Sequence, residues 1–177
     1  MKMTPWRWYN RTMLKLATLL DNPGEPLPET RYRDPARLAE LGYNGLVLFG
    51  TTSISGVARP DSVGGGEMQR WVQQQIDHVR ERIAAAQEAG LEVYMTIDAL
   101  SLPSALVGRE SEQMQCKGRS KSICPASDGA LEAATSAVVD QIGQLAGIDG
   151  IVLRIGDSDA GRYPYLVGND VYSPHCA

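Results

Sequence analysis

Residues 34–50, DPARLAELGYNGLVLFG, contain the pattern from which the fold can be predicted. Asp34 is a favourable helix N-cap and Pro35 suits the first helical position, so a helix is expected to begin there. Gly42 can adopt the left-handed backbone conformation that ends a helix. After a short turn, the apolar run at residues 45–50 predicts a buried β-strand. These residues therefore form one unit of helix, glycine, short turn and strand.

The same order of elements recurs twice further along the chain. Apolar residues at helical spacing predict a helix from about Met68 to Ala89, which Gly90 ends before a strand at residues 91–97. A further helix is predicted from Ser127 or Asp128 to Gly147, before a strand at residues 151–155. Its apolar stripe consists of Leu131, Thr135, Val138, Ile142 and Leu145. A first strand is expected within residues 13–20.

Helices that alternate with short strands predict a parallel sheet with right-handed crossovers. The turns from helix to strand are short, whereas the connections from strand to helix are long, at residues 50–67, 98–126 and 156 onward. Long loops at the carboxyl ends of strands are where barrels of this class place binding and catalysis. We expect an α/β fold that is the N-terminal half of a TIM-type (β/α)8 barrel, with about four parallel strands and three helices.

The length of the chain suggests that this barrel is incomplete. The 177 residues are expected to form a single incomplete (β/α)-barrel domain, since a closed barrel takes roughly 250 residues. The last strand would also lie at an open edge, which invites pairing. Truncation is therefore expected, with the barrel completed by a missing C-terminal half or by a second chain.

Composition narrows the classes of partner. The formal net charge of −4 argues against nucleic acid or an acidic membrane surface. The three cysteines form no disulfide framework, which indicates a reducing, cytoplasmic location, although a Cys116–Cys124 bridge stays open. Their spacing matches no zinc knuckle, and no motif indicates a cofactor, so neither a metal nor a cofactor is expected. No stretch is long and apolar enough for a membrane span, and the N-terminus does not read as a signal peptide.

Two charged residues are predicted to meet above the sheet. Alternation along the strands turns Asp98 and Arg154 toward the inside of the barrel, near the carboxyl ends of adjacent or near-adjacent strands. They would form either a structural ion pair or a clamp that binds the hydroxyl or carboxylate groups of a substrate. Just past the last strand, Asp157 and Asp159 are placed for general acid or base catalysis, or for an Asx-turn.

The long loops add candidate binding residues. Thr51 and Thr52 supply hydroxyl groups in the first loop. The last loop offers aromatic, amide and charged side chains that suit a sugar, with the rings stacked on its C–H faces, although such tyrosines also serve packing. These residues are Arg162, Tyr163, Tyr165 and Asn169.

The region of the last strand resembles a known family. Residues 149–154, DGIVLR, followed by Asp157-Ser158-Asp159, resemble the fourth-strand region of α-glucuronidase-type barrel glycoside hydrolases. The resemblance implies a general acid at Asp157 or Asp159 and a basic substrate contact at Arg154. The family's acid is usually Glu, so the aspartates here are one methylene shorter. The second catalytic carboxylate would come from a later strand, so the isolated chain is expected to be inactive.

Three functions are compatible with these patterns. The first is the N-terminal part of a glycoside hydrolase that acts on a carbohydrate, including sugar-acid substrates, by carboxylate acid–base catalysis. The second is another barrel enzyme, a lyase or isomerase, that binds a carboxylate substrate through Arg154 and Asp98. The third is a non-catalytic carbohydrate-binding or assembly module.

Overall fold

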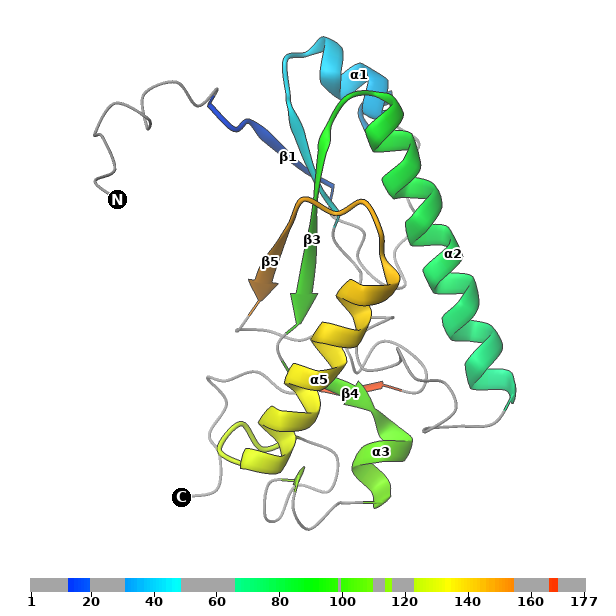
Figure 1. The fold of residues 1–177 in the computed structure, drawn as a ribbon, viewed down its shortest axis with the longest axis vertical. Coiled ribbons are helices and arrows are strands. Elements are labelled where there is room, and N and C mark those ends of the chain that lie inside the picture. The colour runs from blue at the N-terminus through cyan, green and yellow to red at the C-terminus, as the bar shows by residue number, and fades with distance from the viewer. Residues whose placement is uncertain are drawn as a thin grey trace, which may run out of the picture.

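The computed structural model describes residues 13–19, 31–48, 66–98, 100–109, 114–115, 123–154 and 166–168. In these residues the chain is an α/β protein whose main sheet lies beside long helices (Figure 1). The strands are β1 (Leu16–Leu19), β2 (Gly45–Leu48), β3 (Glu92–Asp98), β4 (Ser101–Pro103), β5 (Gly150–Arg154) and β6 (Leu166–Gly168). The helices are the 3-10 turn η2 (Arg31–Arg33), α1 (Pro35–Glu40), α2 (Gly66–Glu88), α3 (Ser104–Arg109) and α5 (Asp128–Gln144).

The main sheet has four parallel strands in the order β1-β2-β3-β5. Neighbouring strands in space therefore follow one another along the chain, apart from the short β4. This confirms the expected parallel sheet, and β1 lies within the range predicted for the first strand. The three expected helices are present as α1, α2 and α5.

The predicted ends of the helices are confirmed. The Asp34 side chain accepts a hydrogen bond from the Ala36 amide at 3.0 Å, as an N-cap does. At the start of α5, the Ser127 hydroxyl accepts from the Ala130 amide at 3.2 Å. After α1, α2 and α5 the chain turns at a glycine with a left-handed backbone, with φ values of 86°, 75° and 91° at Gly42, Gly90 and Gly147.

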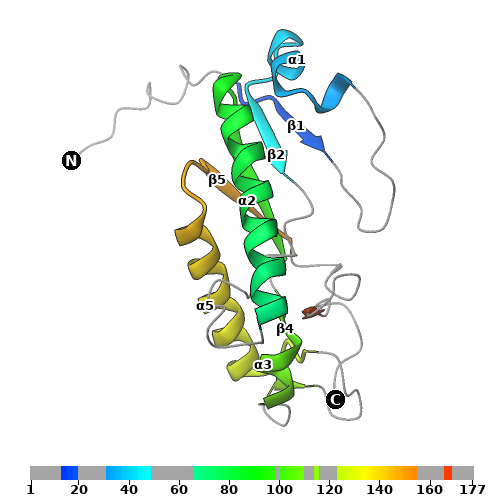
Figure 2. The ribbon, with the colours of Figure 1, turned by 90° about the vertical axis from the view of Figure 1, so that its right-hand side faces the viewer.

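The three crossover helices lie on the same face of the sheet. Alternate residues of the strands, such as Leu46 and Met95, pack in one core with Leu38 of α1 and the apolar side of α2. Ile151 of β5, which pairs in register with Met95, lines a groove with α5. Figure 2 shows α2 lying along the strands with α5 beside it. A sheet with its helices on one face differs from a doubly wound sheet, in which helices cover both faces.

One correction concerns residues 98–126, which were expected to be a plain loop. They contain β4 and α3. β4 pairs antiparallel with β6, which lies in the stretch from residue 156 onward that was also expected to be a loop. The three elements and one side of α5 enclose a second apolar cluster, which lies beyond the carboxyl ends of β3 and β5 (Figure 1). Its buried members are Leu100, Leu102, Val107, Met114, Ile123, Ala130 and Ala134.

A second correction concerns the apolar stripe of α5. The residues of α5 that are fully buried are Ala130, Ala134 and Gln141, and not Leu131 or Thr135 of the expected stripe. Small alanines allow α5 to approach the second cluster closely. Leu131, Thr135 and Val138 of the stripe instead line an open groove beside β5. Leu145, at the end of the stripe, is buried in the main core as expected. Helical periodicity therefore identified the helix and the packed position at its end, but not the close packing of its first turns.

The second and last strands of the main sheet start in the same way. Asn44-Gly45-Leu46-Val47-Leu48 and Asp149-Gly150-Ile151-Val152-Leu153 share the pattern of a polar residue, a glycine and an apolar run. The side chain of each polar residue accepts a hydrogen bond from a backbone amide that lies in the neighbouring strand or directly before it. Asn44 Oδ1 accepts from the Lys15 amide at 2.6 Å, and Asp149 Oδ2 accepts from the Val93 amide at 2.8 Å. These bonds help to set the register of both strands.

The glycines that follow make room for one aromatic ring. Tyr94 of β3 lies between Gly45 and Gly150 of the two neighbouring strands. A Cβ atom on Gly150 would lie 2.8 Å from Cδ1 and Cε1 of Tyr94, too close for contact without movement. The ring therefore lies on the face of the sheet opposite the helices, near the amino ends of the strands, where neither Gly45 nor Gly150 carries a side chain.

Candidate functional site

The candidate site lies where β3 and β5 end. Asp98 is the last residue of β3 and Arg154 the last residue of β5, and the two are direct partners in the parallel register. Because the strands are parallel, their carboxyl ends meet at one edge of the sheet. The sequence prediction that these two residues meet there is confirmed.

Alternation along β3 decides which way Asp98 points. Val93 and Met95 pack against α2, so Thr96 and Asp98, which stand one position out of phase, lie on the opposite face. Thr96 and Asp98 are both buried, as is Val47 of β2 on the same face. Asp98 is thus a carboxylate held away from water at the carboxyl end of β3.

Asp98 and Arg154 form a two-point ion pair. Arg154 Nε donates to Asp98 Oδ1, and Arg154 Nη2 donates to Asp98 Oδ2 at 2.8 Å. This bidentate arrangement uses the planar fork of the guanidinium and fixes its orientation. A buried carboxylate needs such a partner, because an unpaired charge away from water is costly.

The two members of the pair differ in their access to solvent. The Asp98 side chain is 2% exposed, whereas the Arg154 side chain is 20% exposed. A ligand that approaches this end of the sheet would therefore meet the guanidinium. A guanidinium presents its N–H donors in a planar fork and stays protonated at any physiological pH. The pair is thus suited to binding an anionic or hydroxyl-rich group and not to donating a proton.

The other predicted site residues lie outside the described residues. They are Thr51, Thr52, Asp157, Asp159, Arg162, Tyr163, Tyr165 and Asn169. Their participation in the site stays a prediction. What the structure does define is the ends of the segment that carries five of them, between Arg154 and Leu166. At its far end, β6 pairs with β4 three to five residues past Asp98 in the sequence.

The sequence analysis did not foresee the β4–β6 pairing beside the site. β4 begins at Ser101, shortly after Asp98, and Leu102 pairs with Val167. Ser101 is buried and Leu102 lies in the second cluster. The available signal was the spacing of apolar residues in a segment that was expected to be a loop. Antiparallel pairing between segments so distant in sequence leaves no local periodicity to detect.

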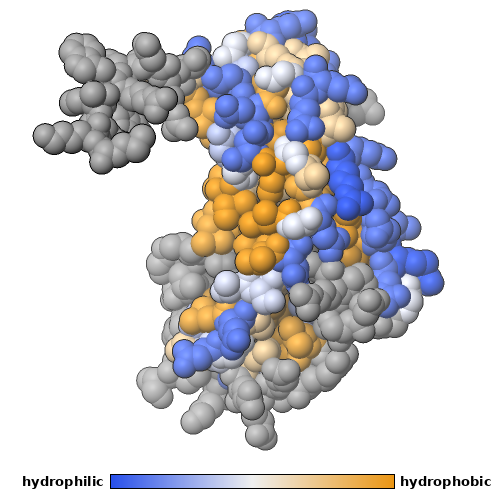
Figure 3. Space-filling view, in the orientation of Figure 1, coloured by the Kyte–Doolittle hydropathy of each residue, from blue (hydrophilic) through white to orange (hydrophobic). Residues whose placement is uncertain are grey.

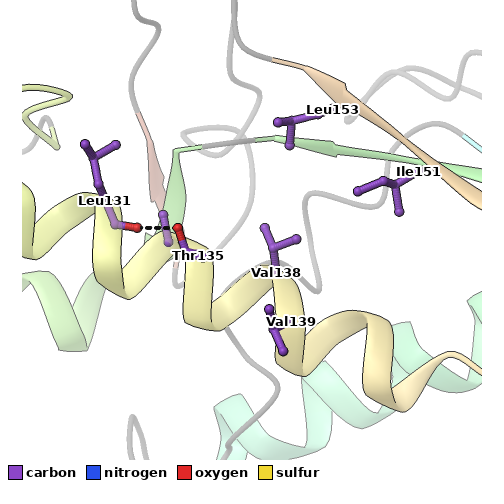
Figure 4. A pocket seen from close by; sticks show the side chains of 7 residues that line it. Leu131, Thr135, Val138, Val139, Ile151 and Leu153 are labelled. Atoms are coloured by element: carbon purple, nitrogen blue, oxygen red, sulfur yellow. Dashed lines mark hydrogen bonds between the residues drawn. The ribbon is translucent and has the colours of Figure 1, made fainter.

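A second feature is an apolar groove between α5 and β5, with a volume of about 260 Å³ (Figure 4). Ile151 and Leu153 project from β5 toward the helix, where Val138 and Val139 lie opposite them. The remaining lining residues are Leu131, Ala134 and Thr135. The polar side chain of this lining, Thr135, donates its hydroxyl hydrogen to the Leu131 carbonyl at 2.8 Å. A groove without polar groups to orient a small molecule is better suited to packing than to catalysis.

Metal and membrane features are absent from the part of the chain that the structure describes. No group of three or more His, Cys, Asp or Glu side chains there could hold a metal ion. The helices of the same residues are all too short or too polar to cross a membrane. Cys124 is buried, and Cys116, its partner in the bridge that the sequence left open, lies outside the described residues.

Comparison of the chain with protein-family models, with curated proteins and with solved structures finds no match.

Proposed function

We propose that this chain is half of a glycoside hydrolase-like (β/α) barrel that binds a carbohydrate bearing a carboxylate. In this proposal Arg154 binds the acidic or hydroxyl groups of the sugar and Asp98 holds the guanidinium in place. Asp157 or Asp159 supplies the general acid, as the resemblance to α-glucuronidase-type enzymes implies. The second carboxylate comes from strands that complete the barrel, so the half alone does not turn over substrate.

One observation carries the proposal: a partly exposed guanidinium, oriented by a buried carboxylate, lies at the carboxyl ends of two adjacent parallel strands. Barrel enzymes build their active sites at this end of the strands.

The sheet supports the barrel component of the proposal. Four parallel strands follow the order of the chain, and α1, α2 and α5 lie on one face. The opposite face carries Tyr94, Thr96 and Asp98, a mixture of aromatic and polar groups that suits a barrel interior that opens into a site at the rim.

Calorimetric titration with D-glucuronate, compared with D-glucose, tests the binding step. The wild-type chain is expected to bind glucuronate. Arg154→Lys retains the positive charge but loses the planar, two-point geometry of the guanidinium, so this variant is expected to bind glucuronate about tenfold more weakly, or worse. D-Glucose controls for the carboxylate, because it matches the sugar in every other contact. Equal binding of both sugars, or no effect of Arg154→Lys on glucuronate, would overturn the role of Arg154.

The catalytic step is tested on the completed barrel with a nitrophenyl glucuronide. Loss of a general acid costs about 10²- to 10⁴-fold in rate, so turnover is expected to fall by that factor in Asp157→Asn or in Asp159→Asn. Asp128→Asn at the start of α5 is the matched control, because it removes an exposed carboxylate remote from the sheet edge. Unchanged turnover in both test variants would exclude an acid at this position.

A lyase or isomerase with a carboxylate substrate is the second candidate. The observation that favours it is that the cation, and not the carboxylate, is the accessible member of the pair. Such an enzyme would bind a short hydroxy acid such as malate as tightly as glucuronate. Titration with malate therefore separates the two candidates, since the glycosidase proposal requires the sugar ring for affinity.

A further inference from the structure

Large apolar residues are exposed on both faces of β5. Ile151 and Leu153 point to the helix side and Val152 to the opposite side, yet their exposures are similar, at 44%, 50% and 41%. The same pattern in β2 gives Leu46, Val47 and Leu48 exposures of 2%, 5% and 0%. β2 has a strand on each side, whereas β5 pairs only with β3 in the described residues. β5 thus lacks, among the described residues, the second neighbour in the plane of the sheet that β2 has.

Exposure on both faces of β5 is not what a missing helix layer or a bound ligand would produce. Either of these would cover one face of the strand, and its absence would leave only that face open. The edge also lacks the usual protection against pairing, since residues 150–153 contain no charge and no proline. Figure 3 shows hydrophobic atoms gathered over this part of the sheet. The edge of β5 is therefore suited to receive another strand.

The opposite edge of the sheet has the same character. β1 pairs only with β2 in the described residues, and Met13, Leu14 and Leu16 beside its outer edge are exposed. The residues of β1 itself carry no charge. Because the sheet is parallel throughout, β1 and β5 run in the same direction at its two edges. A strand that runs parallel to β5 could therefore be a β1.

We propose that two copies of this chain associate through these edges, with β5 of each copy beside β1 of the other, to form a closed eight-stranded parallel sheet. A two-fold axis along the strand direction makes both contacts at once and keeps all pairing parallel. Eight strands is the number at which a parallel barrel closes with an interior filled by side chains. Pairing of β5 with β5 would instead be antiparallel and would leave both β1 edges exposed.

Such a dimer also completes the candidate site. The two-fold axis brings the carboxyl ends of all eight strands to the same rim, so two Asp98–Arg154 pairs face one mouth. This inference rests on the half-barrel geometry of the proposed function but is independent of its carbohydrate chemistry.

Sedimentation velocity of the full chain, from low to high micromolar concentration, tests the proposal. The expected species is a dimer with twice the 19.2 kDa mass of the chain. Val152→Lys on one edge and Leu16→Lys on the other should each raise the dimer dissociation constant by about 30-fold or more, the scale of a hot-spot loss. Both residues are already solvent-accessible in the single chain, and circular dichroism checks that each variant stays folded.

Leu41→Lys is the matched control, because Leu41 is an exposed leucine at the end of α1 and belongs to neither edge strand. This variant should remain a dimer. A wild-type chain that stays monomeric would overturn the proposal and indicate that another polypeptide completes the sheet. Dissociation by Val152→Lys but not by Leu16→Lys would also overturn it, in favour of β5–β5 pairing. Neither result bears on glucuronate binding, which the titration measures separately.

Discussion

Removal of Arg154 should destabilise the chain far more than removal of Asp98. In Arg154→Met the Asp98 carboxylate, which is buried, loses the bidentate partner that neutralises it. In Asp98→Asn the guanidinium loses its charge partner but can still be hydrated, since Arg154 is partly open to solvent. The asymmetry follows from the different burial of the two groups and not from the strength of their bond.

The magnitudes follow from the same geometry. Breaking a buried pair by removal of one partner costs about 3–5 kcal/mol, so that range is expected for Arg154→Met. Loss of hydrogen bonds to a charged group costs about 1.5–3 kcal/mol, the range expected for Asp98→Asn. The double variant leaves no unpaired charge and should resemble Asp98→Asn. The coupling energy between the two sites should then equal the cost of Arg154→Met, about 3–5 kcal/mol.

Urea unfolding at pH 7 and one fixed protein concentration measures all four corners of this cycle. Unchanged m-values would show that the comparison reflects stability alone. Arg37→Met/Glu40→Gln on α1 is a control pair, since these residues form an ion pair at 2.6 Å but are both exposed. It should show coupling below about 0.5 kcal/mol. A similarly small coupling for Asp98 and Arg154 would refute the assignment of Asp98 as a buried, oriented partner.

Three further changes probe how the sheet and α5 are held. Gly150→Ala should lower the free energy of unfolding by about 1–3 kcal/mol, because the added methyl group collides with the Tyr94 ring. Tyr94→Leu in the same chain should recover part of this loss in thermal melts. An unchanged melting temperature in Gly150→Ala would contradict the close contact between the two residues. Ser127→Ala should cost about 1 kcal/mol in urea unfolding through loss of the N-cap, whereas Ser127→Asp should be nearly neutral. Asp149→Ala should lower the free energy of unfolding by about 1–2 kcal/mol and speed hydrogen exchange at the Val93 amide, because that amide loses its acceptor. Asp149→Asn is the control, since its side chain keeps an acceptor oxygen. Exchange at the Val93 amide that stays slow in the alanine variant would exclude this hydrogen bond.

Much of the main sheet could be predicted from the sequence because its signals are local. The N-caps at Asp34 and Ser127 and the glycines that end the helices act within one turn of chain. Alternation within β3 was enough to place Asp98 on the face opposite α2. The meeting of Asp98 and Arg154 followed once the strands were taken as parallel neighbours.

The parts that could not be predicted depend on contacts between distant segments. β4 and β6 are each three residues long, and they pair although the whole of α5 lies between them in the sequence. Neither is long enough for a periodic pattern, so their pairing depends on the second apolar cluster and not on propensity. The packed side of α5 was missed for a related reason, because close approach to that cluster selects alanines over larger residues.

The order of elements, their parallel direction and the pairing of a carboxylate with a guanidinium could all be derived from the amino-acid sequence, since each depends on local patterns along the chain. Which of these groups meets solvent could be known only from the folded chain. Arg154 is the accessible member of its pair, and the shared pattern of β2 and β5 is buried in one strand and exposed in the other. The burial of a residue depends on its neighbours in space. Two similar stretches of sequence are therefore buried to different extents when one lies inside a sheet and the other at its edge.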